Sequence, residues 1–290
     1  MTLQNIGFIG LGVMGLSMTR NLMDAGYKLH VHTRTKSKAD PVLPKAQWHD
    51  DPNSICESCD IIFTMLGFPE DVKAIYHPET GLLKHAKPNT ILVDFTTSDP
   101  CLAQELSEEG EARQISVLDA PVSGGDVGAQ NGTLSIMVGG PEKAFNRIKP
   151  ILEAMGTNIV HHGEAGKGQH VKMVNQIAIA ASMVAVSEAL AYSTKVGLDP
   201  DKLFQSIGSG AAGSWTLSNL GPRMLASNFD PGFYVKHFIK DMDIAMASAK
   251  KMNLKVPGLE LARSLYEQLI KKDHGDSGTQ ALYTLFDSQN

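Results

Sequence analysis

A glycine pattern near the start of the chain limits the folds that it can adopt. Residues 6–15 read IGFIGLGVMG, an apolar stretch that ends in the spacing GxGxxG. A helical pattern follows over 14–24, Gly26 closes it, and a second apolar stretch covers 27–32. A strand, a glycine turn, a helix and a second strand make a βαβ unit, which requires a parallel sheet.

Each glycine of that turn has its own role in such a unit. Gly10 permits the tight turn, Gly12 lets the backbone approach a pyrophosphate, and Gly15 allows helix and strand to pack closely. The helix N-terminus adds N–H groups and the positive end of the helix dipole. The sequence therefore predicts a dinucleotide-binding domain with a phosphate loop made of Gly10, Leu11, Gly12, Val13, Met14 and Gly15.

Basic residues follow the second expected strand, where a NAD site usually has an acid that bonds the ribose hydroxyl. Residues 32–38 read HTRTKSK and contain no acid. Arg34, with Thr35 and Lys38 close behind, can form charge-assisted hydrogen bonds to a 2′-phosphate. We therefore expect NADP, with NAD as the alternative cofactor. The alternative interpretation of the same residues is a solvated basic surface loop with no role in cofactor binding.

Strands and helices alternate through the first half of the chain. The patterns predict strands over 60–66, 90–94 and 115–119, with helices over 69–76 and 100–110 between them. Further strands over 133–138 and 158–160 flank a helix over 142–155, and we expect them to extend the sheet or to pair antiparallel at one edge. The fold class is therefore α/β, with a Rossmann-type doubly wound sheet.

The pattern changes near Gly163. Residues 168–196 contain no proline and are rich in alanine, which predicts one long buried helix ending at Gly197. The rest of the chain has helical patterns, with turn signals at 208–213, 230–232 and 257–258. We expect a dinucleotide-binding domain over 1–163, followed by an all-α C-terminal domain over 164–290 for substrate binding and oligomerisation.

Composition narrows the class of protein. The 290 residues carry a net charge of -5 and no basic stretch studded with aromatics, which argues against a nucleic-acid partner. The apolar run at 177–186 is too short to span a bilayer, and we expect no signal peptide because the first strand begins close to Met1 without a basic segment before it. Three cysteines, Cys56, Cys59 and Cys101, indicate a reducing compartment, so we expect a cytoplasmic protein. We interpret the CxxC spacing as core packing and expect no metal site.

In open α/β sheets, ligands lie at the carboxyl ends of the strands. Met65 and Leu66 end one expected strand and Thr96 follows another, so we predict that these residues line the nicotinamide half of the cofactor. After the strand over 115–119 come Ser123, Gly124 and Gly125. Their hydroxyl and N–H groups could form a nest for a substrate carboxylate, although a simple turn is an equal alternative.

Three polar residues lie at the start of the long helix. Lys172, Asn175 and Gln176 stand at i, i+3 and i+4 and therefore share one face. Burial would lower the lysine pKa from about 10.4 toward the range of a general base. Lys172 could then exchange a proton with a substrate hydroxyl during hydride transfer. The competing interpretation is a lysine that extends its ammonium into solvent at a helix end.

Four motifs occur in order along the chain: GFIGLGVMG at 7–15, DAPVSGG at 119–125, GKGQHVK at 166–172 and KD at 240–241. Together they resemble the motifs of the β-hydroxyacid dehydrogenases, a family that includes 3-hydroxyisobutyrate dehydrogenase, tartronate semialdehyde reductase and the glyoxylate/succinic semialdehyde reductases. The resemblance covers almost the whole length of the chain.

The resemblance implies roles for several residues. Lys172 would be the acid/base, and Ser123 with its two glycines would hold the substrate carboxylate. Thr96 and Lys240 would approach the cofactor. The family usually has asparagine four residues after the lysine, whereas this chain has Asn175 at i+3 and Gln176 at i+4. Which amide contacts the substrate therefore stays open.

The C-terminal half contributes less certain candidates. Trp215 and Phe233 are expected to close over the substrate and cofactor, and an ordinary core or interface role for Trp215 is the alternative. Family members associate through the helical domain, so we expect a homodimer or homotetramer.

The function predicted from the sequence is hydride transfer between NADP(H) and a small 3-hydroxy acid or semialdehyde, with 2-hydroxy and keto acids also possible. One alternative is a decarboxylating phosphogluconate-type dehydrogenase, which the short length and the lack of a phosphate-binding cluster oppose. The other is a non-catalytic NADP-binding protein, since a fold does not entail an activity.

Overall fold

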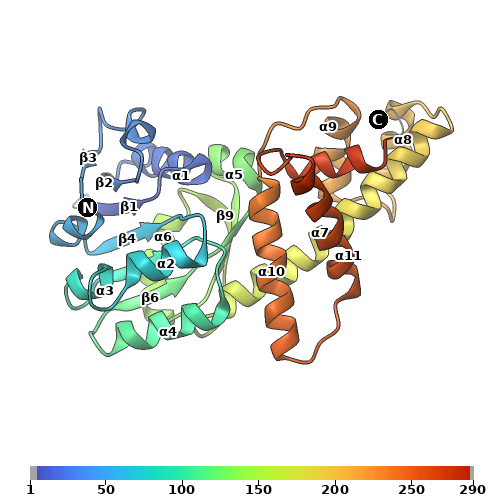
Figure 1. Ribbon diagram of the computed structural model, residues 1–290. Helices are drawn as coiled ribbons and strands as arrows, with labels where there is room; N and C mark the ends of the chain where they lie inside the picture. Colours follow the sequence, from blue (N-terminus) through green and yellow to red (C-terminus); the bar gives the residue numbers. More distant parts are fainter. Residues whose placement is uncertain (1–4, 288–290) are drawn as a thin grey trace. The chain divides into compact units, whose positions relative to one another are not determined.

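The computed structural model describes residues 5–287 (Figure 1), and the chain divides into two compact units, Met1–Lys172 and Met173–Asn290. We call them unit 1 and unit 2. Unit 1 is α/β, and the described part of unit 2 is helical apart from one isolated bridge between Tyr234 and Gly278. The predicted fold class, a Rossmann-type sheet followed by an all-α region, is confirmed.

A parallel sheet of six strands forms the centre of unit 1. Its spatial order is β3-β2-β1-β4-β5-β6, so the order reverses between β1 and β4. The strands are β1 (Asn5–Ile9), β2 (Lys28–His32), β3 (Gln47–Trp48), β4 (Ile61–Thr64), β5 (Ile91–Asp94) and β6 (Ser116–Asp119). Such a reversal is the place where doubly wound sheets bind ligands, at the carboxyl ends of the strands.

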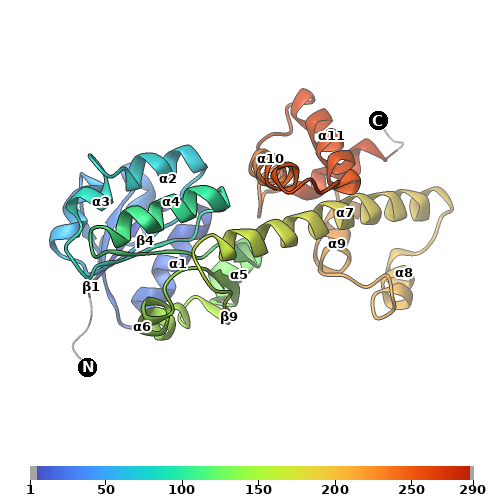
Figure 2. The same cartoon turned by 90° about the horizontal axis from the view of Figure 1, so that it is seen from below.

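Helices cover both faces of this sheet. Figure 2 shows α2 and α4 on one face and α1 and α6 on the other. Alternate residues of β4 belong to different cores, because Ile61 and Phe63 pack in one cluster and Ile62 packs in another. The short elements of unit 1 are α1 (Val13–Asp24), α2 (Pro69–Tyr76), α3 (Leu82–His85), α4 (Pro100–Glu111), η1 (Lys36–Ala39) and η2 (Pro52–Glu57). Burial on both sides explains the continuous apolar runs that predicted the strands.

The strands after β6 form a second sheet, and this corrects the expectation that they extend the first. β7 (Val122–Ser123) pairs antiparallel with β8 (Leu134–Val138), which pairs in parallel with β9 (Gly156–His161). Pro121 lacks a backbone N–H, so β6 does not continue as a donor strand and the chain resumes as β7. α5 (Gly125–Asn131) and α6 (Glu142–Leu152) connect the strands of this sheet.

α7 (Lys167–Lys195) is the predicted long helix, and it begins in unit 1. The units divide between Lys172 and Met173, inside α7, whereas the sequence boundary was placed before the helix. The remaining elements are α8 (Pro200–Ile207), η3 (Thr216–Leu220), α9 (Gly221–Leu225), α10 (Val235–Lys251), α11 (Pro257–Lys271) and η4 (Thr279–Leu285). The turn predicted at 257–258 was wrong: Pro257 begins α11, because proline is well tolerated in the first turn of a helix.

α7 is long and apolar enough to cross a membrane by length and composition, with a mean hydropathy of 1.5 over its most apolar window. The run at 177–186 that seemed too short is thus part of a longer helix. Ala180, Met183 and Leu190 are fully buried in the core of unit 2, as in the core helix of a globular domain.

Cys56 and Cys59 are buried in the core of unit 1, in accord with the packing role predicted for them. Burial raises the pKa of each thiol to about 12.

Candidate active site

The glycine turn between β1 and α1 is built as the sequence predicted. Gly10 has a φ of 99°, and a Cβ on it would lie 2.2 Å from the carbonyl oxygen of Met65. A Cβ on Gly15 would lie 1.9 Å from the carbonyl oxygen of Gly10. Both positions therefore exclude any side chain, one because of its turn and the other because of close packing.

The space around Gly12 fits a bound pyrophosphate. A Cβ on Gly12 would meet nothing within 4 Å, so packing within the protein does not require glycine there. The N-terminus of α1 has no side-chain cap and no acidic residue in its first turn. Leu11 is only 1% exposed and packs in the core of unit 1, whereas Val13 is exposed. A helix N-terminus in this state suits an anion.

The basic residues after β2 lie on the surface. Arg34, Thr35 and Lys38 are exposed, and the Arg34 side chain has an exposed fraction of 83%. Its guanidinium donates to Oδ1 of Asp71 in α2 over 3.2 Å. The other oxygen of Asp71 accepts the Phe68 N–H over 3.2 Å. Asp71 was not predicted as a site residue, because its partner Arg34 lies 37 residues away in the sequence, beyond the range of any local pattern.

The loops after β4 and β5 are tied to each other by Thr96. The Leu66 N–H donates to Oγ1 of Thr96 over 2.8 Å, and the Thr96 N–H donates to Oδ1 of Asp94 over 3.1 Å. Thr64 also donates its hydroxyl to Asp94 Oδ1 over 2.8 Å. Asp94 is buried at the end of β5, and burial raises its pKa to about 6. The structure thus brings the predicted residues Leu66 and Thr96 together over a buried carboxyl group.

A second buried carboxylate, Asp119 at the end of β6, holds the start of α7. Its Oδ1 accepts the Gly166 N–H and its Oδ2 accepts the Gln169 N–H, each over 2.7 Å. Burial raises the pKa of Asp119, and these two hydrogen bonds oppose that shift. The first N–H groups of a helix lack acceptors within the helix, and the Asp119 carboxylate supplies acceptors for two N–H groups at the start of α7. These bonds explain why the first turn of α7 belongs to unit 1.

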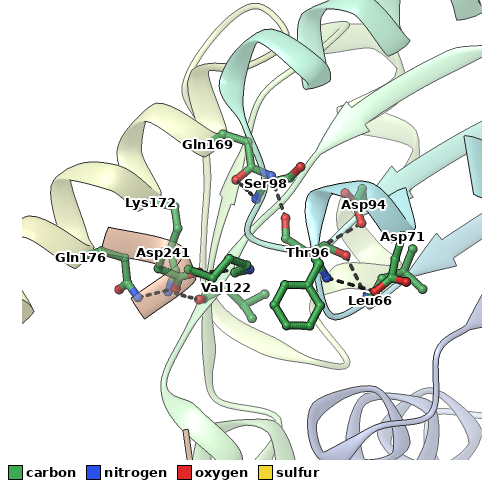
Figure 3. Close-up of polar contacts among 12 residues, drawn as sticks. Leu66, Asp71, Asp94, Thr96, Ser98, Val122, Gln169, Lys172, Gln176 and Asp241 are labelled. Carbon is green, nitrogen blue, oxygen red and sulfur yellow. Dashed lines mark hydrogen bonds and ion pairs between the residues drawn. The ribbon is translucent and has the colours of Figure 1, made fainter. Parts of the chain in front are cut away.

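The side chain of Gln169 joins α7 to the loop after β5. Its Nε2 donates to the Thr96 carbonyl over 2.7 Å, and its Oε1 accepts the Ser98 N–H over 2.9 Å (Figure 3). Gln169 is completely buried. A cavity of about 10 Å³ beside it, lined also by Asp94 and Ser98, has room for about one water molecule and is too small for a substrate.

Lys172 lies one turn further along α7. Its side chain is buried, with 7% of the residue exposed, and its Nζ donates to the Val122 carbonyl over 2.9 Å. Ser123, the next residue in β7, precedes Gly124 and Gly125, whose φ angles are 130° and 64°. The structure thus brings Lys172 close to the segment predicted to hold a carboxylate. A lysine that reaches into solvent at a helix end does not fit this burial.

The other predicted residues lie in unit 2. Nδ2 of Asn175 donates to Oε1 of Gln176 over 2.8 Å, and Nε2 of Gln176 donates to Oδ2 of Asp241 over 2.6 Å. Gln176 is buried with both ends of its amide bonded, whereas Asn175 is partly exposed. Nζ of Lys240 forms an ion pair with Oδ1 of Asp241 over 3.1 Å.

Two aromatic candidates of unit 2 have different surroundings. Phe233 is partly buried and packs against Phe238, with ring centroids 5.7 Å apart. Trp215 is 54% exposed, which excludes the core role that was one alternative for it.

Sequence reasoning missed the residues that hold the site together: Asp71, Asp94, Asp119 and Gln169. A usable signal existed for two of them, since Asp94 and Asp119 are charged residues at the ends of apolar strands. Charged residues are seldom fully buried without partners, so their position predicts a polar network.

Comparison with known families matches both parts of the chain. Residues 5–163 match the family described as the NAD binding domain of 6-phosphogluconate dehydrogenase. Residues 166–286 match the NAD-binding region of NADP-dependent 3-hydroxyisobutyrate dehydrogenase. The fold and the site define a nicotinamide-dependent oxidoreductase of the hydroxyacid dehydrogenase type. The chain belongs to the β-hydroxyacid dehydrogenase family.

Individual relatives cover nearly the whole chain. It is 52% identical over 284 residues to the uncharacterised oxidoreductase YkwC of Bacillus subtilis, covering 98% of this chain and 99% of the relative. It is 39% identical to 2-hydroxy-3-oxopropionate reductase of Escherichia coli, covering 90% and 89%. A solved structure of Psf3 in complex with NADP+ and 2-OPP has a TM-score of 0.91 and 26% identity, covering 97% and 100%.

Proposed function

We propose that this protein is an NADP-preferring reductase of small aldehyde or keto acids that also works in reverse as a 3-hydroxyacid dehydrogenase. The observation that carries the proposal is the buried ammonium of Lys172, which donates to the Val122 carbonyl next to Ser123. A buried lysine beside a candidate carboxylate nest suits proton exchange with a bound hydroxy acid better than it suits packing.

The residues of the site have separate tasks in this proposal. When bound, the reduced nicotinamide supplies a hydride to the carbonyl carbon of the substrate. Lys172 donates a proton to the carbonyl oxygen, and in the reverse direction it accepts that proton from the hydroxyl. Ser123, Gly124 and Gly125 hold the carboxylate through the hydroxyl and backbone N–H groups, which fixes the carbonyl beside Lys172.

We assign the substrate-facing amide to Asn175. Both ends of the Gln176 amide are already bonded, to Asn175 and to Asp241, and Gln176 is buried. Asn175 donates its Nδ2 to Gln176 and is partly exposed. Its Oδ1 is therefore available to accept a hydrogen bond from a substrate hydroxyl. Gln176 then orients Asn175.

The preference for NADP rests on Arg34, Thr35 and Lys38. All three are exposed at the end of β2, next to the glycine turn in the sheet order. A planar guanidinium recognises phosphate through paired hydrogen bonds, and no acidic residue stands where a NAD site usually has one. The solved structure of the relative Psf3 with NADP+ is consistent with this choice.

The first experiment compares oxidation of NADPH and NADH by the wild type with a panel of aldehydes: glyoxylate, tartronate semialdehyde, succinic semialdehyde and methylmalonate semialdehyde. We expect turnover that is faster with NADPH, and a loss of ~10²–10⁴-fold in kcat for Lys172→Ala with the affinity for NADPH retained. Lys167→Ala, at an exposed lysine that begins α7, is the matched control.

Two results would contradict the proposal. If the wild type binds NADPH and turns over no aldehyde, the protein is a nucleotide-binding protein without this chemistry. If Lys172→Ala keeps its rate, another group exchanges the proton. Release of CO₂ from 6-phosphogluconate would instead favour a decarboxylating dehydrogenase.

We further propose that the protein is a homodimer or homotetramer. Unit 2 exposes large apolar side chains on α7, where the exposed fractions of Val174 and Tyr192 are 67% and 70%. Exposed apolar surface of this kind supports association between copies. Sedimentation of the wild type and of Tyr192→Glu tests it: we expect an oligomer that the substitution weakens, and a monomeric wild type would refute it.

A further inference from the structure

We infer that Gln169 is a positioning residue, whose side-chain amide sets the place of the Lys172 ammonium relative to the loop after β5. The inference deepens the proposed function and rests on it, because it takes Lys172 as the acid/base. The hydrogen bonds of Gln169 go to Thr96, Ser98 and Asp119 and reach neither the proposed substrate nest nor the glycine turn, so Gln169 acts through its neighbours.

Every polar group of the Gln169 side chain, together with its backbone N–H, bonds to the end of a strand or to the segment that follows one. The backbone N–H donates to Asp119 at the end of β6. The amide Nε2 and Oε1 bond the Thr96 carbonyl and the Ser98 N–H after β5. Thr96 and Ser98 lie beyond the last residue of β5, so sheet pairing does not fix this loop. The amide group contains both a donor and an acceptor, and these match the Thr96 carbonyl and the Ser98 N–H of the loop.

Helix geometry transmits this contact to Lys172. The two residues are three positions apart on α7, which places them on one side of the helix with a rise of about 4.5 Å between them. Lys172 makes its own contact with Val122, after β6. The first two turns of α7 thus hold both the loop after β5, predicted to face the nicotinamide, and the segment at Val122.

A small displacement of these two turns would be sufficient to slow the reaction. Hydride and proton transfers need their partners aligned, and a misplacement of about 1 Å can lower a rate by roughly 100-fold. In the proposed function the glycine turn and the residues after β2 hold the phosphates of NADPH, and the Gln169 amide bonds neither segment. Loss of the amide should therefore lower kcat more than it changes either KM.

The test is Gln169→Met, which keeps the length of an unbranched side chain and removes both hydrogen bonds. The matched control is Gln280→Met, because Gln280 is also buried and its Nε2 donates to the Asn228 and Asp230 carbonyls, both over 3.0 Å, in unit 2. Gln169→Glu, which keeps an acceptor for the Ser98 N–H, serves if Gln169→Met does not fold.

We expect amide hydrogen exchange over residues 95–98 to become faster in Gln169→Met and to stay unchanged in Gln280→Met. We also expect kcat to fall ~10–100-fold with each KM within about threefold of the wild type. The primary isotope effect on kcat with 4-deuterated NADPH should rise, because the chemical step becomes rate-limiting.

Unchanged exchange over residues 95–98, or an unchanged kcat and isotope effect, would overturn the inference. An equal loss of kcat in Gln280→Met would also overturn it, since that would be general destabilisation. If the wild type reduces no aldehyde, the proposed function fails by itself, and the exchange measurement still decides whether Gln169 holds the loop.

Discussion

The loops after β5 and after β2 both border the predicted cofactor site, yet they are held in opposite ways. The loop after β5 is buried, and its polar groups bond Asp94, Leu66 and Gln169. The segment after β2 is exposed, and its Arg34 guanidinium bonds the carboxylate of Asp71 on the surface. In the proposed function the loop after β5 faces the nicotinamide, which reacts. The segment after β2 faces the ribose, which distinguishes NADP from NAD and does not react.

The difference teaches where the molecule has fixed geometry and where it can vary. A buried hydrogen-bonded network favours one arrangement, because each lost hydrogen bond leaves an unpaired polar group out of water. An exposed ion pair contributes about 0–1 kcal/mol and is screened by salt. Substitutions in the buried network should therefore change stability and rate, whereas substitutions after β2 should change cofactor choice.

The largest effect on stability should follow from Asp119→Ala. This substitution leaves the Gly166 and Gln169 N–H groups buried without an acceptor, so we expect a loss of about 3–5 kcal/mol in the free energy of unfolding. Urea denaturation measures it. Asp199 offers a matched control, because it accepts the Asp201 and Lys202 N–H groups at the start of α8 but is exposed. Asp199→Ala should cost about 1 kcal/mol, and equal losses would remove the contrast.

Asp94→Asn should change how stability depends on pH. The pKa of Asp94 is raised from 3.8 to about 6 in the folded state, so its contribution is fully present below pH 3.8 and is lost as the pH rises through 6. At about 1.4 kcal/mol per pH unit, the loss at pH 7 is about 3 kcal/mol. Asparagine has no such titration and can still accept from Thr64 and Thr96.

The raised pKa of Asp94 makes the unfolding free energy of the wild type fall between pH 4 and 6.5, and we expect Asp94→Asn to lack this contribution. Urea denaturation at several pH values measures the difference. Asp40→Asn, at an exposed carboxylate, should leave the fall unchanged. A fall that persists in Asp94→Asn would assign it to other groups, Asp119 first, since burial raises its pKa as well.

Arg34→Leu should affect the choice of cofactor and leave stability alone. Loss of a charge-assisted contact to the 2′-phosphate should raise KM for NADPH by ~10–100-fold and leave KM for NADH within about twofold. Steady-state kinetics with both cofactors decides it. Lys45→Leu, which removes another exposed cation, is the control. Equal changes for NADPH and NADH would show that Arg34 does not recognise the phosphate.

The smallest effect should come from Asp71→Asn. In the wild type, Arg34 must break its ion pair with Asp71 before it can bind the 2′-phosphate, and the substitution removes this cost. We therefore expect NADPH to bind up to about fivefold more tightly, and the gain should be smaller at 1 M salt. Fluorescence titration of NADPH measures the change, with Glu70→Gln on the same helix as the control. Weaker binding would instead mean that Asp71 holds Arg34 in its working orientation.

Much of the fold was predictable because its signals are local. The helix over 69–76 was predicted with the same bounds as α2, and β2, β5 and β6 differ by one residue at their N-terminal ends. Burial of both faces of the sheet makes each strand a continuous apolar run. The second sheet was misjudged, because the pairing of β7 with β8 depends on chain direction after Pro121 and has no local signature.

The candidate site divides in the same way. The turn around Gly10 and Gly15 followed from a spacing of six residues, and the structure supplies a steric reason for each. The alternatives for Lys172 and for the two amides could not be decided from spacing. Residues at i, i+3 and i+4 share a face whether that face is buried or exposed, and burial depends on what packs against it.

The sequence by itself determined the βαβ start, the change to a helical C-terminal half, the lack of an acid after β2 and the lysine on α7. These are properties of neighbouring residues. The tertiary structure alone decided that Asp119 caps α7 and that the Gln169 side chain forms hydrogen bonds with the loop after β5. Those partners stand 47 and 73 residues apart in the chain, for Asp119 with Gly166 and for Gln169 with Thr96. A hydrogen bond forms only when donor and acceptor come within about 3 Å, and the folding of the chain between them determines whether they do.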